Sequence, residues 1–435
     1  MDPFNIAIIT VGFLLTYLVL GVWVFVAVLM VGISSLYLLL DFPLDRLGSI
    51  MRSTMWNTAS SYQLASVPMF ILMGEIIFRT NISDKLFRGI APWANAVPGR
   101  LLHTNVGGCT LFAAISGSST ATTATVGKIT LTELRDRGYD QNLALGSLAG
   151  AGSLGLLIPP SIAMIIYGIL SETSIAHLFA AGLLPGLMIA GLFSGYIALR
   201  AATDKSVVTE PKEVFTLRQY LYSFVDLLPI FILLFIVMGG IYSGIVTPSE
   251  AAALGVAAAV FMTLATGQGN LAMLRDALVA ASRTSCMVLS ILIAAAFMSS
   301  AIAFAHVPQA SAQLIAALDL GPISLMLLIG AFYLVVGMFL DGLSIMVMTL
   351  PITLPLIVAA GWDPVWFGVF LVIAIELGLI TPPVGFNLFV IQGMTGKPIT
   401  QIARAAVPFF LLMILAALLL IAFPQIALIM PELLF

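Results

Sequence analysis

The segment Leu154–Pro160 (LGLLIPP) recurs later in the chain as Leu377–Pro383 (LGLITPP), and both copies lie within long apolar stretches. A tandem proline removes backbone N–H donors and clashes with the preceding turn, so a helix that contains it must open. In lipid, an opened backbone group costs several kcal/mol unless protein, water or an ion satisfies it. Matching interruptions in two halves of a chain therefore indicate a transport site near the middle of the bilayer.

The composition predicts an integral membrane protein. Of the 435 residues, 61% are hydrophobic and only 9% are charged, which is outside the range of soluble globular domains. A net charge of −3 with scattered bases gives no nucleic-acid-binding surface, and Cys109 and Cys286 are too few for a disulfide framework or a structural metal site. The sequence offers no nucleophile with a base and no phosphate-binding loop, so we do not expect an enzyme.

Apolar runs of about 20 residues, the length that crosses a bilayer, occur five times in each half of the chain. They are residues 4–20, 22–40, 62–78, 143–170, 176–199, 224–242, 251–265, 284–305, 365–391 and 402–423. Before its third crossing each half has a short amphipathic segment, at 45–56 and 270–281. After that crossing each half has an apolar stretch with a polar middle, at 101–131 and 323–356, which we interpret as a re-entrant hairpin.

An odd number of crossings per half predicts an all-α fold in which the second repeat is inverted relative to the first. On this count 15 of the 17 Lys and Arg residues lie on one face, and only Arg46 and Arg52 lie on the N-terminal face. By the positive-inside rule the base-rich face is cytoplasmic, so both termini face outward. Residues 1–200 would form the first repeat, 201–220 a cytoplasmic linker and 221–435 the second repeat.

The first predicted hairpin turns at a cluster of hydroxyl side chains, Ser116, Ser118, Ser119 and Thr120, which no lipid-facing helix needs. Two short helices that meet at their tips direct backbone groups and hydroxyls at one point. Carbonyls and hydroxyls are hard oxygen ligands for an alkali cation, and the N-terminus of the returning helix attracts a carboxylate. The alternative is that these small residues only allow helices to approach closely.

The second predicted hairpin turns at Asp341, at a depth where an ionised carboxylate is costly. An acid inside the membrane indicates a functional site, whereas the alternatives are a structural partner for a base such as Lys128 or a tip that lies in water. Glu376, just before the second tandem proline, could serve likewise, or could cap or pack a helix.

If the four interruptions converge, we expect two pseudo-equivalent cation sites that flank one anionic substrate. The first site would use oxygens of Ser116, Ser119, Gly155, Ile158 and Pro160. The second would use Gly342, Gly378, Thr381 and Val384. Ser118, Thr120 and Asp341 are candidates for contact with the substrate or for coupling it to the cation.

The chain resembles the large membrane (M) subunit of the tripartite ATP-independent periplasmic (TRAP) transporters, which belong to the ion-transporter superfamily. The resemblance covers nearly the whole chain and rests on Ser116–Ser119, Leu154–Pro160, Gly240–Ala252 and Asp363–Gly385. It implies sodium-driven import of small organic acids, such as dicarboxylates, sugar acids or sialic acids, by an elevator-like motion. One departure is Trp23, where we would expect a proline; it concerns the scaffold and not the site.

The resemblance also implies a location and partners. The location is the bacterial inner membrane, and the partners are a small four-helix membrane subunit and a periplasmic substrate-binding protein. Sodium would be the coupling ion, with no other cofactor. Two other interpretations stay open: a stand-alone sodium/dicarboxylate symporter of the same superfamily, and a membrane scaffold subunit without a transport site.

Overall fold

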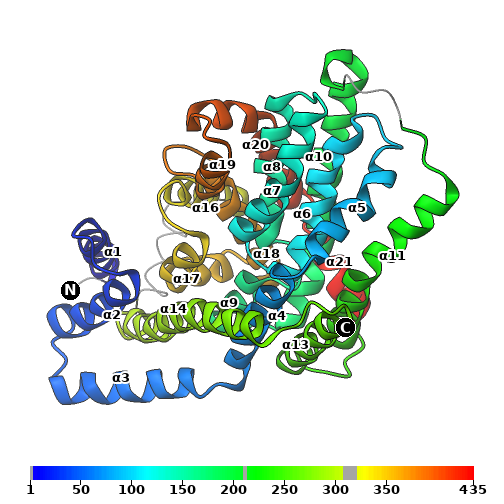
Figure 1. Ribbon diagram of the computed structural model, residues 1–435. Coiled ribbons are helices and arrows are strands. Elements are labelled where there is room, and N and C mark those ends of the chain that lie inside the picture. The colour runs from blue at the N-terminus through cyan, green and yellow to red at the C-terminus, as the bar shows by residue number, and fades with distance from the viewer. Residues whose placement is uncertain (1–2, 209–212, 307–320) are drawn as a thin grey trace.

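The computed structural model in Figure 1 describes residues 3–208, 213–306 and 321–435, which form helices and no strands. Within these ranges six helical segments are long and apolar enough to cross a membrane, or seven if the bent pair α3 and α4 counts as one span. The six are Ile175–Thr203, Leu217–Tyr242, Pro248–Ala265, Leu271–Phe304, Gly342–Ala359 and Ile399–Ala422. The prediction of an all-α membrane fold is confirmed, although several of the ten predicted crossings fall on shorter or interrupted helices.

The described residues of the first half form ten α-helices. They are α1 (Pro3–Val19), α2 (Val24–Ser34), α3 (Leu44–Ala59), α4 (Ser66–Phe78), α5 (Ile82–Ala94), α6 (His103–Ser116), α7 (Ser119–Asp136), α8 (Gln141–Gly152), α9 (Ile162–Leu170) and α10 (Ile175–Thr203). Trp23, the unexpected residue before α2, is 80% exposed.

The described part of the second half contains a corresponding series. Its helices are α11 (Leu217–Leu234), α12 (Gly240–Tyr242), α13 (Pro248–Ala265), α14 (Leu271–Phe304), α16 (Pro322–Gly337), α17 (Gly342–Ala359), α18 (Pro364–Leu379), α19 (Phe386–Thr395), α20 (Ile399–Ala422) and α21 (Gln425–Leu434). The C-terminus and α3 lie towards the bottom of Figure 1, and α19 lies towards the top.

Several helices differ from the sequence prediction. The amphipathic segment at 270–281 and the crossing at 284–305 form one continuous helix, α14, because no residue between them stops the helix. Helices α5 and α21 were not predicted, because α5 carries several charges on its outer face and α21 has only 10 residues.

The predicted linker at 201–220 is only partly irregular. Helix α10 continues to Thr203, a short 3-10 helix follows at Lys205–Val207, and α11 starts at Leu217. Hydrogen bonds from the hydroxyl and the backbone N–H of Ser206 hold the pKa of Asp204 below its usual value. Residues 209–212 lie outside the described residues.

Helix packing follows a reciprocal pattern between the halves. Helix α7 packs against α19 while α17 packs against α9, and α6 packs against α8 while α16 packs against α18. Likewise α4 packs against α13, and α14 packs against α2. Small residues permit the closest approaches: a Cβ atom on Gly146 of α8 would lie 2.0 Å from the carbonyl oxygen of Ala405 of α20. This packing brings both hairpins and both interrupted helices into one unit.

Candidate functional site

The first hairpin turns within two residues. Helix α6 ends at Ser116, Gly117 adopts a left-handed backbone conformation with φ +57°, and α7 starts at Ser119. Glycine tolerates this conformation because it has no Cβ atom. The Ser118 hydroxyl accepts a hydrogen bond from the N–H of Ala121 at 3.4 Å and so caps α7. The turn therefore lies where the sequence predicts it.

The first tandem proline interrupts a helix. After α8 a 3-10 turn covers Ser153–Leu156, a cis peptide bond joins Pro159 to Pro160, and α9 starts at Ile162. The Ser161 hydroxyl donates to the carbonyl oxygen of Leu156 and accepts from the N–H of Met164 at 3.3 Å. All residues of this break are buried, so the protein itself surrounds the opened backbone.

The tip of the first hairpin touches this break. A Cβ atom on Gly155 would lie 2.6 Å from the carbonyl oxygen of Ser118 and from the Cα of Ser119. A Cβ atom on Gly117 would lie 3.2 Å from the carbonyl oxygen of Pro160. Ser119, Gly155 and Pro160, three of the predicted ligands, are therefore brought together.

The other two residues of the predicted first site lie at the same contact between the hairpin tip and the first break. The Ser116 hydroxyl lies 2.7 Å from the Thr122 hydroxyl and 3.3 Å from the Ser118 carbonyl oxygen. Ile158 is buried in the break, and its side chain packs beside Gly186 of α10. The Thr120 and Ser118 hydroxyls lie 3.3 Å apart on the returning helix.

The second hairpin and the second break repeat this arrangement. Helix α18 ends at Leu379, a cis peptide bond joins Pro382 to Pro383, and α19 starts at Phe386. The N–H groups of Val384 and Gly385 donate to the carbonyl oxygen of Met338, at 3.2 and 3.4 Å. The break is therefore held against the end of α16.

The residues of the predicted second site lie around this contact. The Thr381 hydroxyl donates to the carbonyl oxygen of Leu377 at 2.6 Å, and the Thr381 N–H donates to that of Gly378 at 3.0 Å. The Gly378 carbonyl thus has one of its two lone pairs engaged. Gly342 is buried at the start of α17, where a Cβ atom would lie 2.9 Å from Ile375.

Two contacts join the first hairpin and the first break to the second hairpin and the second break. A Cβ atom on Gly342 would lie 3.2 Å from the side chain of Leu156 in the first break. The hydroxyl of Ser119 donates a hydrogen bond to Oε1 of Glu376 on α18. All four interruptions therefore meet at one place, which we name the central junction.

The two breaks differ in exposure. The prolines of the first break are buried, whereas Pro382 and Pro383 are exposed and Thr381 and Val384 are partly exposed. The central junction is therefore accessible from the surface of this chain at the second break, whereas the first break is buried inside the protein.

Of the two acids at the central junction, Asp341 has a clear structural role. It is half-buried and caps α17, accepting a hydrogen bond from the N–H of Ser344 at 3.1 Å. Lys128, the base considered as its partner, is exposed, and no ion pair joins the two in the described residues. Sequence reasoning gave Glu376 less weight than Asp341, although Glu376 is only 1% exposed.

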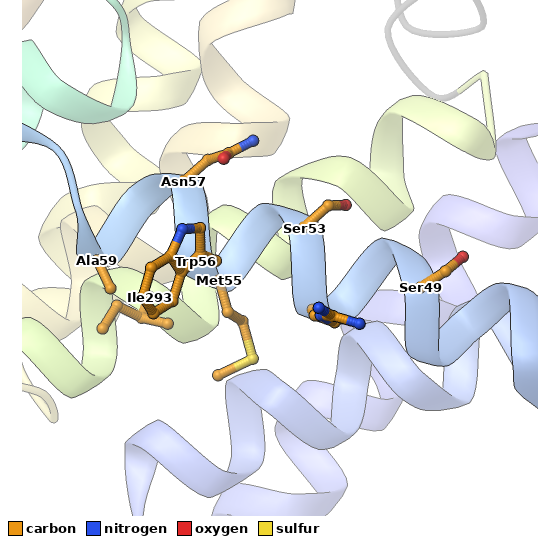
Figure 2. Close-up of a pocket in the computed structure, with 8 residues that line it drawn as sticks. Ser49, Ser53, Met55, Trp56, Asn57, Ala59 and Ile293 are labelled. Carbon is orange, nitrogen blue, oxygen red and sulfur yellow. The ribbon is translucent and has the colours of Figure 1, made fainter.

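A separate surface groove lies along α3, as Figure 2 shows. It combines apolar side chains with hydroxyls, an amide and an arginine, and Trp56 in it is 71% exposed. Its lining residues are Ser49, Arg52, Ser53, Met55, Trp56, Asn57, Ala59 and Ile293. None belongs to a hairpin or a break, so the groove is distinct from the central junction. Trp and Arg side chains of this kind suit a membrane–water interface.

The family of the chain follows from its sequence match. The family model of the tripartite ATP-independent periplasmic transporter, DctM component, matches residues 11–426. The chain belongs to this family. As a DctM-family protein it is a multi-pass membrane transporter permease and not an enzyme, and its family's transporters are tripartite.

Its relatives include permeases for chemically different solutes. It is 33% identical to the C4-dicarboxylate TRAP transporter large permease protein of Pseudomonas aeruginosa, over 92% of this chain and 93% of that one. It is 34% identical to the ectoine/5-hydroxyectoine TRAP transporter large permease protein of Ruegeria pomeroyi, over 86% of each chain. The crystal structure of the Alcanivorax borkumensis YdaH transporter has a similar fold, with a TM-score of 0.64 and 12% identity over 88% of this chain and 89% of that one.

Proposed function

We propose that this chain is the transmembrane subunit of a sodium-coupled, binding-protein-dependent secondary transporter that imports small organic acids. The observation that carries the proposal is the meeting of two hairpin tips and two helix breaks at the central junction. Opened backbone carbonyls and hydroxyls at such a junction are ligands of the hard oxygen type that alkali cations take.

The proposed cation sites use the residues that the junction brings together. Ser116, Ser119, Gly155, Ile158 and Pro160 form the first site, and Gly342, Gly378, Thr381 and Val384 form the second. Between them, Ser118 and Thr120 at the N-terminus of α7 face an anionic substrate, because a helix N-terminus favours negative charge. Asp341, at the start of α17, modulates the field at the second site.

Transport proceeds by an elevator-like motion in this proposal. The hairpins and the interrupted helices form the mobile unit, and the remaining helices form a scaffold with the small membrane subunit. The reciprocal packing of the two halves supports an inverted repeat of residues 1–200 and 221–435, joined by a cytoplasmic linker. The chain then lies in the bacterial inner membrane with both termini in the periplasm.

The C4-dicarboxylate relative favours an organic acid as the substrate, whereas the ectoine relative marks how far the family's solutes vary. A periplasmic binding protein delivers the substrate, and a small four-helix membrane subunit completes the complex. The tripartite family description supports both partners.

Reconstitution of the chain into liposomes tests the proposal. With the small subunit and the binding protein present, an inward sodium gradient should drive substrate accumulation, and a potassium gradient should not. Accumulation without the binding protein would instead favour a stand-alone symporter. If alanine at Ser116 to Thr120 left sodium-driven uptake intact, a scaffold subunit would be the better interpretation.

A further inference from the structure

Glu376 is a buried carboxylate that links the two halves of the chain. It lies on α18, one turn before that helix ends, and is 1% exposed. Its Oε1 accepts a hydrogen bond from the hydroxyl of Ser119, the first residue of α7. Glu376 is therefore held between the second interrupted helix and the tip of the first hairpin.

The other oxygen of this carboxylate has no partner. Oε2 is buried and accepts no hydrogen bond from the described residues. No described Lys, Arg or His forms an ion pair with Glu376. A buried carboxylate without a neighbouring positive charge is costly, and buried charges are found paired or bound to a metal ion. A bound cation would supply the positive charge that the protein does not.

Two further polar groups in the adjoining helices also lack partners. Thr123 follows Ser119 by one turn of α7, and its buried hydroxyl has no hydrogen bond. Asn387 lies in the first turn of α19, which packs against α7, and neither amide atom has a partner. Buried polar groups are nearly always satisfied by protein, water or an ion. Helices α7 and α19, which pack against each other, thus carry further buried polar atoms without partners.

The unpartnered carboxylate adjoins the proposed first cation site. Ser119 touches Glu376 on one side and lies beside Gly155 of the first break on the other. We propose that Glu376 is the anionic ligand of the first-half cation site, contributed across the junction by the second half. This inference rests on the proposed function, whose ligands for that site are all neutral. A carboxylate adds a hard, charged oxygen to them.

One consequence is coupling between the two cation sites. A cation held by Glu376 also holds α18 two residues before Gly378, a ligand of the second site. Binding at the first site would therefore favour the arrangement that the second site needs, which gives positive cooperativity. Sodium binding should then be sigmoidal, and it should become less so when the charge of Glu376 is removed.

The test is Glu376→Gln in the full-length chain together with its small membrane subunit. Glutamine keeps the volume and an acceptor for the Ser119 hydroxyl, and it removes only the charge. Sodium binding is measured by thermal stabilisation at constant ionic strength, with potassium replacing sodium. We expect the apparent sodium affinity to fall by at least about tenfold, because losing even a group that only supports the ligands of a metal site has an effect of that size. Glu376→Asp should retain part of the affinity.

The matched control is Glu133→Gln, which removes a partly exposed acid from α7 far along the helix from the tip. It should leave the sodium affinity unchanged. Wild-type affinity in Glu376→Gln would overturn the inference, since the side chain would then act only as a neutral acceptor for Ser119. If sodium stabilised the wild-type protein no more than potassium did, the proposed function itself would fail, so the two failures are distinguishable.

Discussion

Gly378 of α18 packs directly against Gly337 at the end of α16. A Cβ atom on Gly378 would lie 2.4 Å from the Cα of Gly337, a distance that no real side chain tolerates. The neighbouring N–H groups of Val384 and Gly385 donate to the carbonyl oxygen of Met338. The absence of a side chain at Gly378 thus allows the second hairpin to dock on the second break.

Substitution of Gly378 by alanine should separate these two elements. Overpacking of this kind costs about 1–3 kcal/mol, so we expect a lower unfolding temperature and a loss of sodium-driven uptake. Gly393→Ala is the control, because nothing lies within 4 Å of a Cβ atom there. Alanine in that helix should leave uptake intact. Equal effects of the two substitutions would show that the close contact does not matter.

Substitution of Gly155 by alanine tests the corresponding contact in the first half. The added methyl group would lie 2.6 Å from the backbone of Ser118 and Ser119, so the hairpin tip must move away from the break. We expect weaker sodium stabilisation of the purified protein than in the wild type. Gly191→Ala on α10, where a Cβ atom meets nothing within 4 Å, should bind sodium normally. Normal sodium binding by Gly155→Ala would show that the contact between the hairpin tip and the first break is not needed for sodium binding.

Asp341 can be tested for its charge separately from its role as a helix cap. Asparagine caps helices about as well as aspartate, whereas alanine costs about 1 kcal/mol. We therefore expect Asp341→Asn to keep the stability of the wild type, and Asp341→Ala to unfold at a lower temperature. Both should lose sodium-dependent uptake if the charge acts on the second site. Full uptake by Asp341→Asn would show that Asp341 acts only as the N-terminal cap of α17.

The proposed pair of cation sites limits how strongly a substrate can be concentrated. Each inward sodium ion contributes about 2.3 kcal/mol from a 100 mV potential and about 1.4 kcal/mol from a tenfold gradient. Two ions give roughly 7 kcal/mol, from which import of a dianion subtracts about 4.6 kcal/mol. The two positive charges of the sodium ions also balance the two negative charges of a dicarboxylate. Uptake of a dicarboxylate with two sodium ions should therefore carry no net current. An inward positive current in proteoliposomes would require a further cation.

The sequence predicted the interruptions because their cause is local. Tandem prolines end a helix wherever they occur, and the structure ends helices before Pro159 and before Pro382. The turn at Gly117 was likewise predictable from small hydroxyl residues around a glycine. Helix α5 was not, because a charged face lowers the apolar content of a segment even when its other face is buried.

The contact between Ser119 and Glu376 could not be predicted in this way. The two residues are 257 positions apart, and no periodic pattern states which face of α18 meets which hairpin. An acid in an otherwise apolar helix was the available signal. It marked Glu376 as unusual but did not distinguish a cap from a ligand. Only the packing of α18 against the first break places the carboxylate at the central junction.

The most direct measurement is sodium-driven uptake by the Ser119→Ala and Thr381→Val variants. It is made in proteoliposomes that also contain the small subunit and the binding protein. Each substitution removes one hydroxyl from one of the two proposed cation sites, and Thr381→Val keeps the side-chain shape. We predict that the folded variants each require more sodium for half-maximal uptake, and that the double variant shows no sodium dependence. Uptake by all three with the sodium dependence of the wild type would contradict the account.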